Sequence, residues 1–112
     1  MSQITSHVLD TSKGLPAEGI TVVLFQWNNN DWLEIGNKIT NRDGRVADLL
    51  SPGTVLPTGL YKLTFKTGEY FTKLSIPAFY PFIEIIFEIS SQEHYHVPLL
   101  LNPFGYSTYR GS

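Results

Sequence analysis

An alternation of apolar and polar residues with a period of two is the feature that most constrains the fold of this chain. In residues 61–66, Tyr, Leu and Phe alternate with Lys, Thr and Lys, and residues 83–89 repeat the pattern with Ile and Phe on one face. Such a period places successive side chains on opposite faces of a β-strand. Residues 20–27 are apolar on both faces, which predicts a central or doubly covered strand. Residues 32–39 form a weaker strand, joined to it by a polar hairpin loop at residues 28–31.

Turn-forming sequences separate the predicted strands. Gly, Pro, Asn, Asp and Ser gather at residues 10–19, 41–44, 51–53, 57–59 and 102–103. Many short strands with turns about every 8–12 residues are typical of a β-sandwich. We therefore predict an all-β fold, a two-sheet Greek-key β-sandwich in a single domain of residues 1–112. Residues 69–74, which follow Gly68 and precede Pro77, are the exception and fit one short helix.

The composition excludes several classes of function. Eight Lys plus Arg stand against ten Asp plus Glu, so the sequence offers no basic face for nucleic acid or for an anionic membrane. There is no cysteine for disulfides or thiol chemistry, and no apolar run approaches the ~20 residues of a membrane span. The first residues have neither a basic start nor an apolar stretch, so we see no secretory signal and expect a cytoplasmic protein. A mature exported protein whose signal has been removed stays open as an alternative.

Residues 94–112 hold an unusual concentration of reactive and aromatic side chains. The pattern His94-Tyr-His96, continued by apolar residues at 97, 99 and 101, alternates as a strand does, so both imidazoles lie on one face. Tyrosines and Arg110 follow, which suggests a site in this stretch. Because these last strands are apolar on both faces and long apolar edges invite pairing, we also expect the chain to bind another copy of itself.

His7 and Arg45 are further candidates, each with an ordinary structural alternative. His7 lies in a strand pattern at residues 5–9, where a lone histidine is more often a partly buried structural residue than a catalytic one. Arg45 follows the Asp43-Gly44 turn, where an arginine is by default solvated. Three histidines are enough ligands for zinc, but no carboxylate is placed to orient them, so we expect no metal. Ser107 has no nucleophile elbow and no evident acid partner, which makes a serine triad improbable.

Several motifs together resemble those of one family. They are Thr-Ser-His-Val-Leu-Asp at residues 5–10, Gly-Leu-Pro-Ala at 14–17, Thr-Asn-Arg-Asp-Gly-Arg at 40–45 and Tyr-Ser-Thr-Tyr-Arg-Gly-Ser at 106–112. The chain resembles the transthyretin-related 5-hydroxyisourate hydrolases of urate degradation over essentially its whole length. The closing Tyr-Arg-Gly-Ser is the most specific element, because transthyretins proper lack it. Asn102, where serine is common in such proteins, is a mild variation.

The resemblance implies a set of site residues and an assembly. His7, Arg45 and His96 would be catalytic, with His7 and Arg45 also holding the substrate. Tyr109 would help bind the substrate, and Arg110, Gly111 and Ser112 would shape the same pocket; His94 matches no catalytic position and is expected to be a neighbour only. The family fold is a transthyretin-like sandwich with a short helix, assembled as a homotetramer, a dimer of dimers, with sites in the channel between dimers. No metal or organic cofactor is implied.

These residue types suit the implied reaction. Water would attack a ring carbonyl of 5-hydroxyisourate and break a C–N bond, giving 2-oxo-4-hydroxy-4-carboxy-5-ureidoimidazoline. His7 and His96 are expected to hold and deprotonate the water, since a neutral imidazole is a base near pH 7, while Arg45 orients the substrate and stabilises the oxyanion. Which histidine takes the proton stays open. The alternative is a non-catalytic transthyretin-like module that binds a small ligand, which would need neither His96 nor the terminal tetrapeptide.

Overall fold

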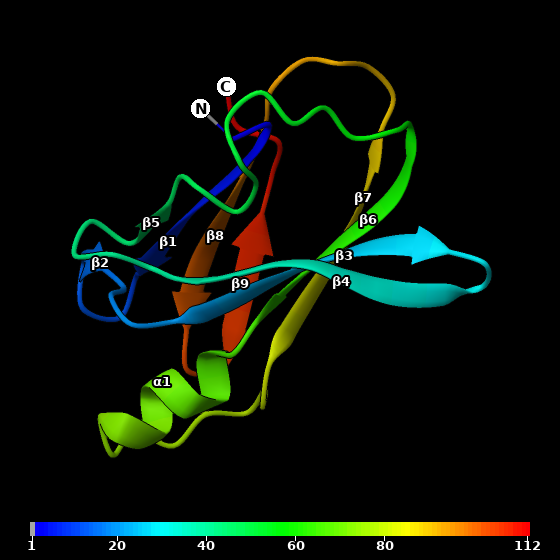
Figure 1. The fold of residues 1–112 in the computed structure, drawn as a ribbon. Helices are drawn as coiled ribbons and strands as arrows, with labels where there is room; N and C mark the ends of the chain where they lie inside the picture. Colours follow the sequence, from blue (N-terminus) through cyan, green and yellow to red (C-terminus); the bar gives the residue numbers. More distant parts are fainter. Residues whose placement is uncertain (1) are drawn as a thin grey trace.

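The computed structural model describes residues 2–112, which form two β-sheets packed face to face with one short helix at an end (Figure 1). One sheet has the strand order β2-β1-β8-β9, with β5 also paired to β1, and the other has the order β4-β3-β6-β7. The predicted all-β, two-sheet sandwich with a short helix is confirmed. The elements in chain order are β1 (Ile4–Asp10), β2 (Leu15–Pro16), β3 (Thr21–Asn28), β4 (Asp31–Ile39), β5 (Arg45–Val46), β6 (Gly59–Phe65), α1 (Thr67–Lys73), β7 (Ile83–Ile89), β8 (Tyr95–Asn102) and β9 (Gly105–Thr108).

The strand β1 organises the first sheet. It pairs in parallel with β8 on one side, and on the other side it is shared by β2 and β5, which pair antiparallel with its two halves. Parallel pairing of two strands requires a long crossover connection. Here that connection contains the whole second sheet, so the two ends of the chain meet in one sheet.

The second sheet follows the sequence pattern closely. The strand β3 lies between β4 and β6, as its apolar residues on both faces predict, and Val22 and Leu24 are fully buried. A two-residue loop joins β3 to β4, and both of its residues, Asn29 and Asn30, have positive φ angles of 51° and 61°. Asparagine tolerates this conformation, which a type I′ hairpin turn requires at both central positions.

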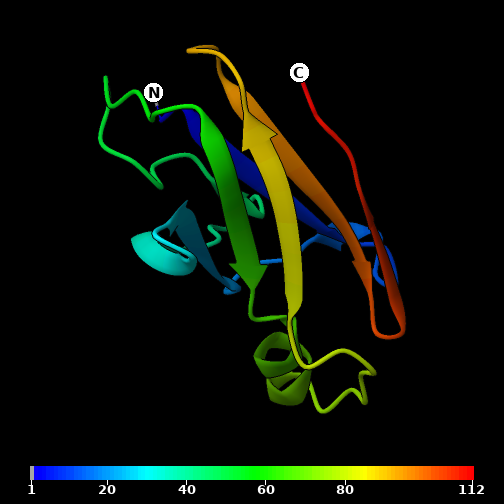
Figure 2. The same ribbon diagram turned by 90° about the vertical axis from the view of Figure 1, so that its right-hand side faces the viewer.

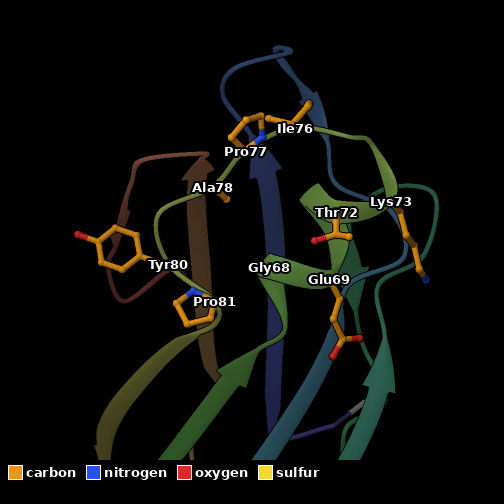
Figure 3. Close-up of a pocket in the computed structure, with 9 residues that line it drawn as sticks. All are labelled: Gly68, Glu69, Thr72, Lys73, Ile76, Pro77, Ala78, Tyr80 and Pro81. Carbon is orange, nitrogen blue, oxygen red and sulfur yellow. The ribbon is translucent and has the colours of Figure 1, made fainter.

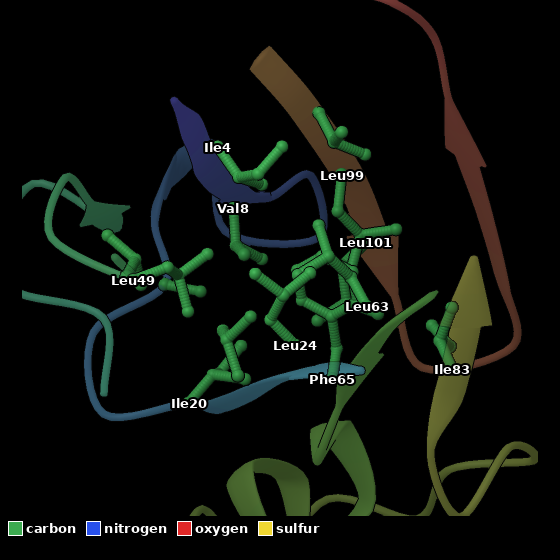
Figure 4. Packing of buried hydrophobic residues seen from close by; sticks show 14 of the residues in the cluster. Ile4, Val8, Ile20, Leu24, Leu49, Leu63, Phe65, Ile83, Leu99 and Leu101 are labelled. Carbon is green, nitrogen blue, oxygen red and sulfur yellow. The ribbon is translucent and has the colours of Figure 1, made fainter. Parts of the chain in front are cut away.

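The core lies between the two sheets (Figure 4). Side chains from both sheets point toward each other there, and Ile4, Val8, Leu24, Leu63 and Leu99 are all 0% exposed. Truncating one such leucine to alanine typically costs about 2–5 kcal/mol of stability. The strictly alternating positions 95, 97, 99 and 101 of β8 are buried, as the sequence predicts.

The outer face of β6 is more covered than its half-buried pattern suggests. Lys62 is only 9% exposed. Its Nζ lies 4.9 Å and 4.8 Å from the ring centroids of Phe25 and Trp32 and forms an ion pair with Glu84 at 3.1 Å. A long side chain can bury its apolar stem while its charge stays paired. The lysine therefore covers the faces of both aromatic rings.

The helix α1 begins two residues before the predicted segment and is tied to β1. Tyr70 Oη donates a hydrogen bond of 2.8 Å to Oδ2 of Asp10, a carboxylate that is 0% exposed. Burial and this carboxylate raise the pKa of Tyr70, so the phenol keeps the proton that it donates. None of the helices formed by residues 2–112 has the length and apolar character needed to cross a membrane.

The last two strands differ in their position. β8 is interior, because β1 covers one side and β9 the other, whereas β9 is an edge strand. Figure 2 shows the segment after β9 running on beside β8. β7 is an edge of the other sheet. Large apolar side chains are exposed at or beside these two edges, namely Phe82 (50%), Ile86 (59%), Phe104 (68%) and Tyr106 (43%).

Candidate active site

A tight turn brings Arg45 opposite His7. In the register of β1 and β5, these two residues are direct partners. Asn41 holds the turn: its side-chain Oδ1 accepts hydrogen bonds from the main-chain N–H groups of Asp43 (2.9 Å) and Arg45 (3.0 Å). This arrangement is an Asx-type turn, which asparagine favours.

Gly44 is required for this turn to pack against β1. Its φ angle is +74°, and a Cβ atom built at this position would lie 2.4 Å from the carbonyl oxygen of Val8. Because the main chains of Gly44 and Val8 lie this close, the N–H of Val8 can donate to the Gly44 carbonyl at 2.8 Å. A side chain at Gly44 would therefore push β5, and Arg45 with it, away from His7.

His96 joins the same face of the sheet through β8. Ile4 and Val8 point into the core, so the alternate residues Thr5 and His7 lie on the outer face. In the parallel β1–β8 register, Thr5 is the partner of His96. The structure therefore brings the three predicted residues, His7, Arg45 and His96, onto one face, although they come from three separate strands.

Thr5 connects His96 to His94. Its hydroxyl oxygen lies 2.8 Å from Nδ1 of His96 and 2.7 Å from Nε2 of His94. The two imidazole rings are stacked, with centroids 6.2 Å apart and planes inclined by 26°. His94, expected to be only a neighbour, is thus hydrogen-bonded to the same hydroxyl as His96. Sequence reasoning missed Thr5, because its contact with both histidines depends on the register of two strands at opposite ends of the chain.

Local electrostatics keep both candidate bases neutral. The pKa of His7 is lowered by partial burial and then by the charge of Arg45, with hydrogen bonding to the main chain of Asp43 and the Asp43 charge acting in opposition. The pKa of His96 is lowered by burial, and further by the charges of Arg45, His94 and His7. An ordinary histidine pKa is about 6.5, so both imidazoles are unprotonated near pH 7.

The cluster surrounds a small hollow of about 200 Å³. Within residues 2–112, the guanidinium of Arg45 makes no hydrogen bond or ion pair, so it is available to a ligand there. His7 is not one of the lining residues, but it is the cross-strand partner of Arg45, which is. The residues lining it are Thr5, Ser6, Arg45, Val46, Ala47, His94, His96 and Ser112.

Gly111 lies directly against His96. The two residues form a β-bridge, and the N–H of Gly111 donates to the His96 carbonyl at 2.8 Å. A Cβ atom at Gly111 would lie 2.6 Å from Cδ2 of His96 and 3.1 Å from Cγ of Pro98. Only glycine fits here without moving the imidazole. This contact brings Ser112 to the hollow that Arg45 and His96 also line.

Tyr109 and Arg110 line a second hollow of about 200 Å³, which His96 shares. The guanidinium carbon of Arg110 lies 4.4 Å from the ring centroid of Tyr95, and its Nη2 is paired with Glu93. Tyr109 is 58% exposed. Of the terminal tetrapeptide, Gly111 therefore contacts His96 and Ser112 lines the same hollow, while Arg110 anchors the segment to β8.

The sequence raises two other kinds of site, a zinc site and a serine triad. Among residues 2–112, no three His, Asp or Glu side chains are grouped in a way that could hold a metal ion. Ser107 lies in β9 opposite Leu100. A larger hollow, about 620 Å³, lies beside α1 and is lined by none of the predicted site residues. Figure 3 shows that Tyr80 and Lys73, on its two sides, point their polar ends away from each other.

The chain also matches the model of a known protein family. The model of the HIUase/Transthyretin family matches residues 4–111, and the chain belongs to this family of small β-sandwich proteins. Within it, a probable 5-hydroxyisourate hydrolase of Caenorhabditis elegans is 47% identical over 112 residues, covering 99% of this chain and 82% of the relative.

Two solved structures are similar to this chain in fold. The 5-hydroxyisourate hydrolase of Klebsiella pneumoniae superimposes with a TM-score of 0.84 at 39% identity, covering 97% of this chain and 92% of the other. Sea bream transthyretin in complex with thyroxine gives a TM-score of 0.91 at 27% identity, covering 98% and 95%. The backbone is thus similar to that of both the hydrolase and the thyroxine-bound transthyretin, whereas the sequence is more similar to that of the hydrolase.

Proposed function

We propose that this chain hydrolyses 5-hydroxyisourate to 2-oxo-4-hydroxy-4-carboxy-5-ureidoimidazoline, a step of urate degradation towards allantoin. The observation that carries the proposal is the convergence of His7, Arg45 and His96 on one face of the sheet, where Arg45 and His96 line one hollow. The 47% identity to a hydrolase relative supports it. The chain is therefore an enzyme that opens a cyclic amide.

His7 and His96 supply the proton transfers. A neutral imidazole takes a proton from the attacking water, a new C–O bond forms at a ring carbonyl, and the C–N bond of the resulting adduct breaks as the nitrogen regains a proton. Nε2 of His96 makes no hydrogen bond within residues 2–112, whereas Nδ1 is bound to Thr5, so Nε2 is the atom free to meet water. General base catalysis of this kind contributes roughly 10²–10⁴-fold.

Arg45 holds the substrate and the developing negative charge. Its planar guanidinium matches a pair of carbonyl or ureide groups. Since it also lowers the pKa of both histidines, the same charge that stabilises the oxyanion keeps the bases unprotonated. The reaction needs only these proton transfers and this charge, so we assign no metal or cofactor.

The terminal tetrapeptide completes the pocket. Gly111 and Ser112 border the histidine cluster, and Arg110 anchors the segment through Glu93 and Tyr95. Tyr109, which is 58% exposed here, provides a ring to pack on the substrate.

The active form is a homotetramer, a dimer of dimers. Ligand pockets are usually clefts of about 300–1,000 Å³, and the hollow at His96 measures only about 200 Å³. Apposition of a second copy would deepen it. Exposed apolar residues at the β7 and β9 edges, such as Ile86 and Tyr106, support pairing through those edges. A cytoplasmic location stays a prediction from the sequence.

The second candidate is a non-catalytic carrier of a small ligand, favoured by the TM-score of 0.91 to the thyroxine-bound transthyretin. One assay separates the two. A urate oxidase generates 5-hydroxyisourate in the cuvette, and its ultraviolet decay is followed with the protein, with His96→Asn as the matched control, and without protein. Acceleration by the wild-type chain alone supports the hydrolase, whereas equal decay in all three samples rules the hydrolase out and leaves the carrier as the remaining candidate.

A further inference from the structure

The hydroxyl of Thr5 is shared between two imidazoles, and this limits where their protons can be. Its Oγ1 lies within hydrogen-bond distance of Nε2 of His94 (2.7 Å) and of Nδ1 of His96 (2.8 Å). Thr5 is only 8% exposed, which leaves water little access to the hydroxyl. A hydroxyl group has one proton to donate. The oxygen could also accept from both rings, but the hydroxyl proton would then have no partner, since Oγ1 makes no other hydrogen bond within residues 2–112. When both histidines are neutral and the hydroxyl proton is bonded to a ring, the hydroxyl therefore donates to one ring and accepts from the other.

Two arrangements satisfy this condition. In the first, Nδ1–H of His96 donates to Thr5, and Thr5 donates to Nε2 of His94; Nε2 of His96 then carries a lone pair. In the second, Nε2–H of His94 donates to Thr5, and Thr5 donates to Nδ1 of His96; the proton of His96 is then on Nε2. The tautomers of the two histidines are thus linked through a single oxygen atom.

We propose that Thr5 and His94 are positioning residues that hold His96 with its proton on Nδ1, ready to accept at Nε2, and that relay the accepted proton toward solvent. This rests on the proposed role of His96 as a base in the hydrolase reaction. Neither residue touches the reacting atoms in this proposal; both act through His96.

The proton balance of the relay is closed. When Nε2 of His96 takes a proton from water, Nδ1 passes its own proton to Thr5 Oγ1, and the threonine hydroxyl passes its original proton to Nε2 of His94. Each intermediate atom gains one proton and loses one. The chain ends in the second arrangement, with the positive charge on His94. The reverse shift lets Nε2 of His96 deliver its proton to the departing nitrogen.

Burial and charge favour this direction of transfer. His96 is half-buried and its charged form is opposed by the groups that face it, namely Arg45 from β5, His7 from β1 and His94. His94 is exposed to solvent. A positive charge is less costly in water than in a partly buried site beside a guanidinium, so moving the proton from His96 to His94 relieves the site of a second cation next to Arg45.

The test uses variants of Thr5 and two measurements. Thr5→Val keeps the shape and removes the hydroxyl, while Thr5→Ser keeps a hydroxyl. Thr11→Val is the control, because it likewise removes the hydroxyl of a threonine, here one that donates to the Leu101 carbonyl at 3.0 Å, away from the histidines. Circular dichroism and thermal melting establish that each variant is folded.

The first measurement is the ¹⁵N nuclear magnetic resonance of the imidazoles, in the protein without substrate and above the pKa of His96. We expect the Nδ1–H tautomer of His96 in the wild-type protein, Thr5→Ser and Thr11→Val, and a shift toward Nε2–H in Thr5→Val and His94→Asn. An Nε2–H tautomer in the wild-type protein, or an unchanged tautomer in Thr5→Val, overturns the proposal. Because no substrate is present, this result is independent of whether the hydrolase assignment holds.

The second measurement is kinetic. Thr5→Val and His94→Asn should lower kcat by about 10- to 100-fold with little change in KM, on the scale known for residues that orient metal-bound histidines through a hydrogen bond. Thr5→Ser should restore most of the loss. Turnover of Thr5→Val within twofold of wild type would overturn the relay, as would an equal loss in folded Thr5→Ser. Loss of the hydrolase assignment would instead appear as no turnover in the wild-type protein.

Discussion

His7 and Arg45 are direct cross-strand partners, held together by a two-residue strand that pairs with the middle of β1. This places a permanent cation beside an imidazole, an arrangement that lowers the pKa of the imidazole rather than raising it. The proposed base, His7, therefore stays unprotonated at neutral pH beside the proposed oxyanion-binding group, Arg45. The relationship depends on the Asn41 turn and on Gly44, both outside the strands themselves.

Reversing the charge of Arg45 should remove turnover while the fold persists. In Arg45→Glu, a carboxylate repels the developing oxyanion, and the loss of one oxyanion-binding group is typically worth about 10²–10³ in kcat. The ultraviolet decay assay gives the rate, and circular dichroism monitors the fold. Arg42→Glu, at an exposed position of the same turn, is the matched control and should behave as wild type. Activity of Arg45→Glu near the control level would remove Arg45 from the site.

His96→Asn should be more damaging than His94→Asn. Asparagine cannot accept the proton from water, so roughly 10²–10⁴-fold should be lost at His96. The sequence alone predicts that His94→Asn keeps much of the activity; the bond from Thr5 to His94 now implies an intermediate loss. Parallel kcat measurements on both variants give the order. Equal, full losses would mean that the roles of the two histidines were wrongly divided.

The pH profile should show a single loss on the acid side, at a pH below the usual histidine range. Because burial and Arg45 lower the pKa of His7 and His96, the neutral, active forms persist below pH 6.5 and disappear only as the pH falls through the lowered values. Rates measured in a constant-ionic-strength buffer series test this. EDTA should change nothing; inhibition by EDTA that zinc reverses would establish the metal site that we judged improbable.

Adding one methyl group at Gly111 should impair catalysis more than stability. A Cβ there would meet Cδ2 of His96 at 2.6 Å, so Gly111→Ala must displace the imidazole. Turnover should fall by about tenfold or more, on the scale known when a metal-bound histidine loses the group that orients it, while the melting temperature changes little. Gly53→Ala, where a Cβ has open space, is the control, although its φ of +84° adds strain.

Deleting residues 109–112 should also abolish activity without unfolding the sandwich.

Disrupting self-association should abolish activity in a folded protein. Ile86 is 59% exposed on the edge strand β7, so Ile86→Lys costs a lone sandwich little. Light scattering at assay concentration should give a tetramer for the wild-type chain and smaller species for the variant, with a parallel loss of turnover. An active monomer of the wild-type chain would contradict the assembly.

Much of the fold was predictable because it depends on local patterns. The alternation in residues 83–89, the hairpin at Asn29 and Asn30, and the short helix each follow from nearby residues alone. The covered outer face of β6 was not predictable, since it results from Lys62 meeting rings of two other strands. At the site, motif resemblance selected His7, Arg45 and His96, but the role of Thr5 emerges only from the parallel register of β1 and β8.

That register also has a consequence for how the enzyme comes into being. Thr5 and His94 are separated by 89 positions along the chain, and pairings of such long range are slow to form because the entropy of closing the loop precedes any gain from contacts. While β8 is still inside the ribosome, a nascent chain has β1 but lacks the strand that carries His96, so the proposed site cannot form. Recovery of turnover after denaturation should therefore coincide with the slowest structural phase of refolding, which makes activity a reporter of the last stage of folding.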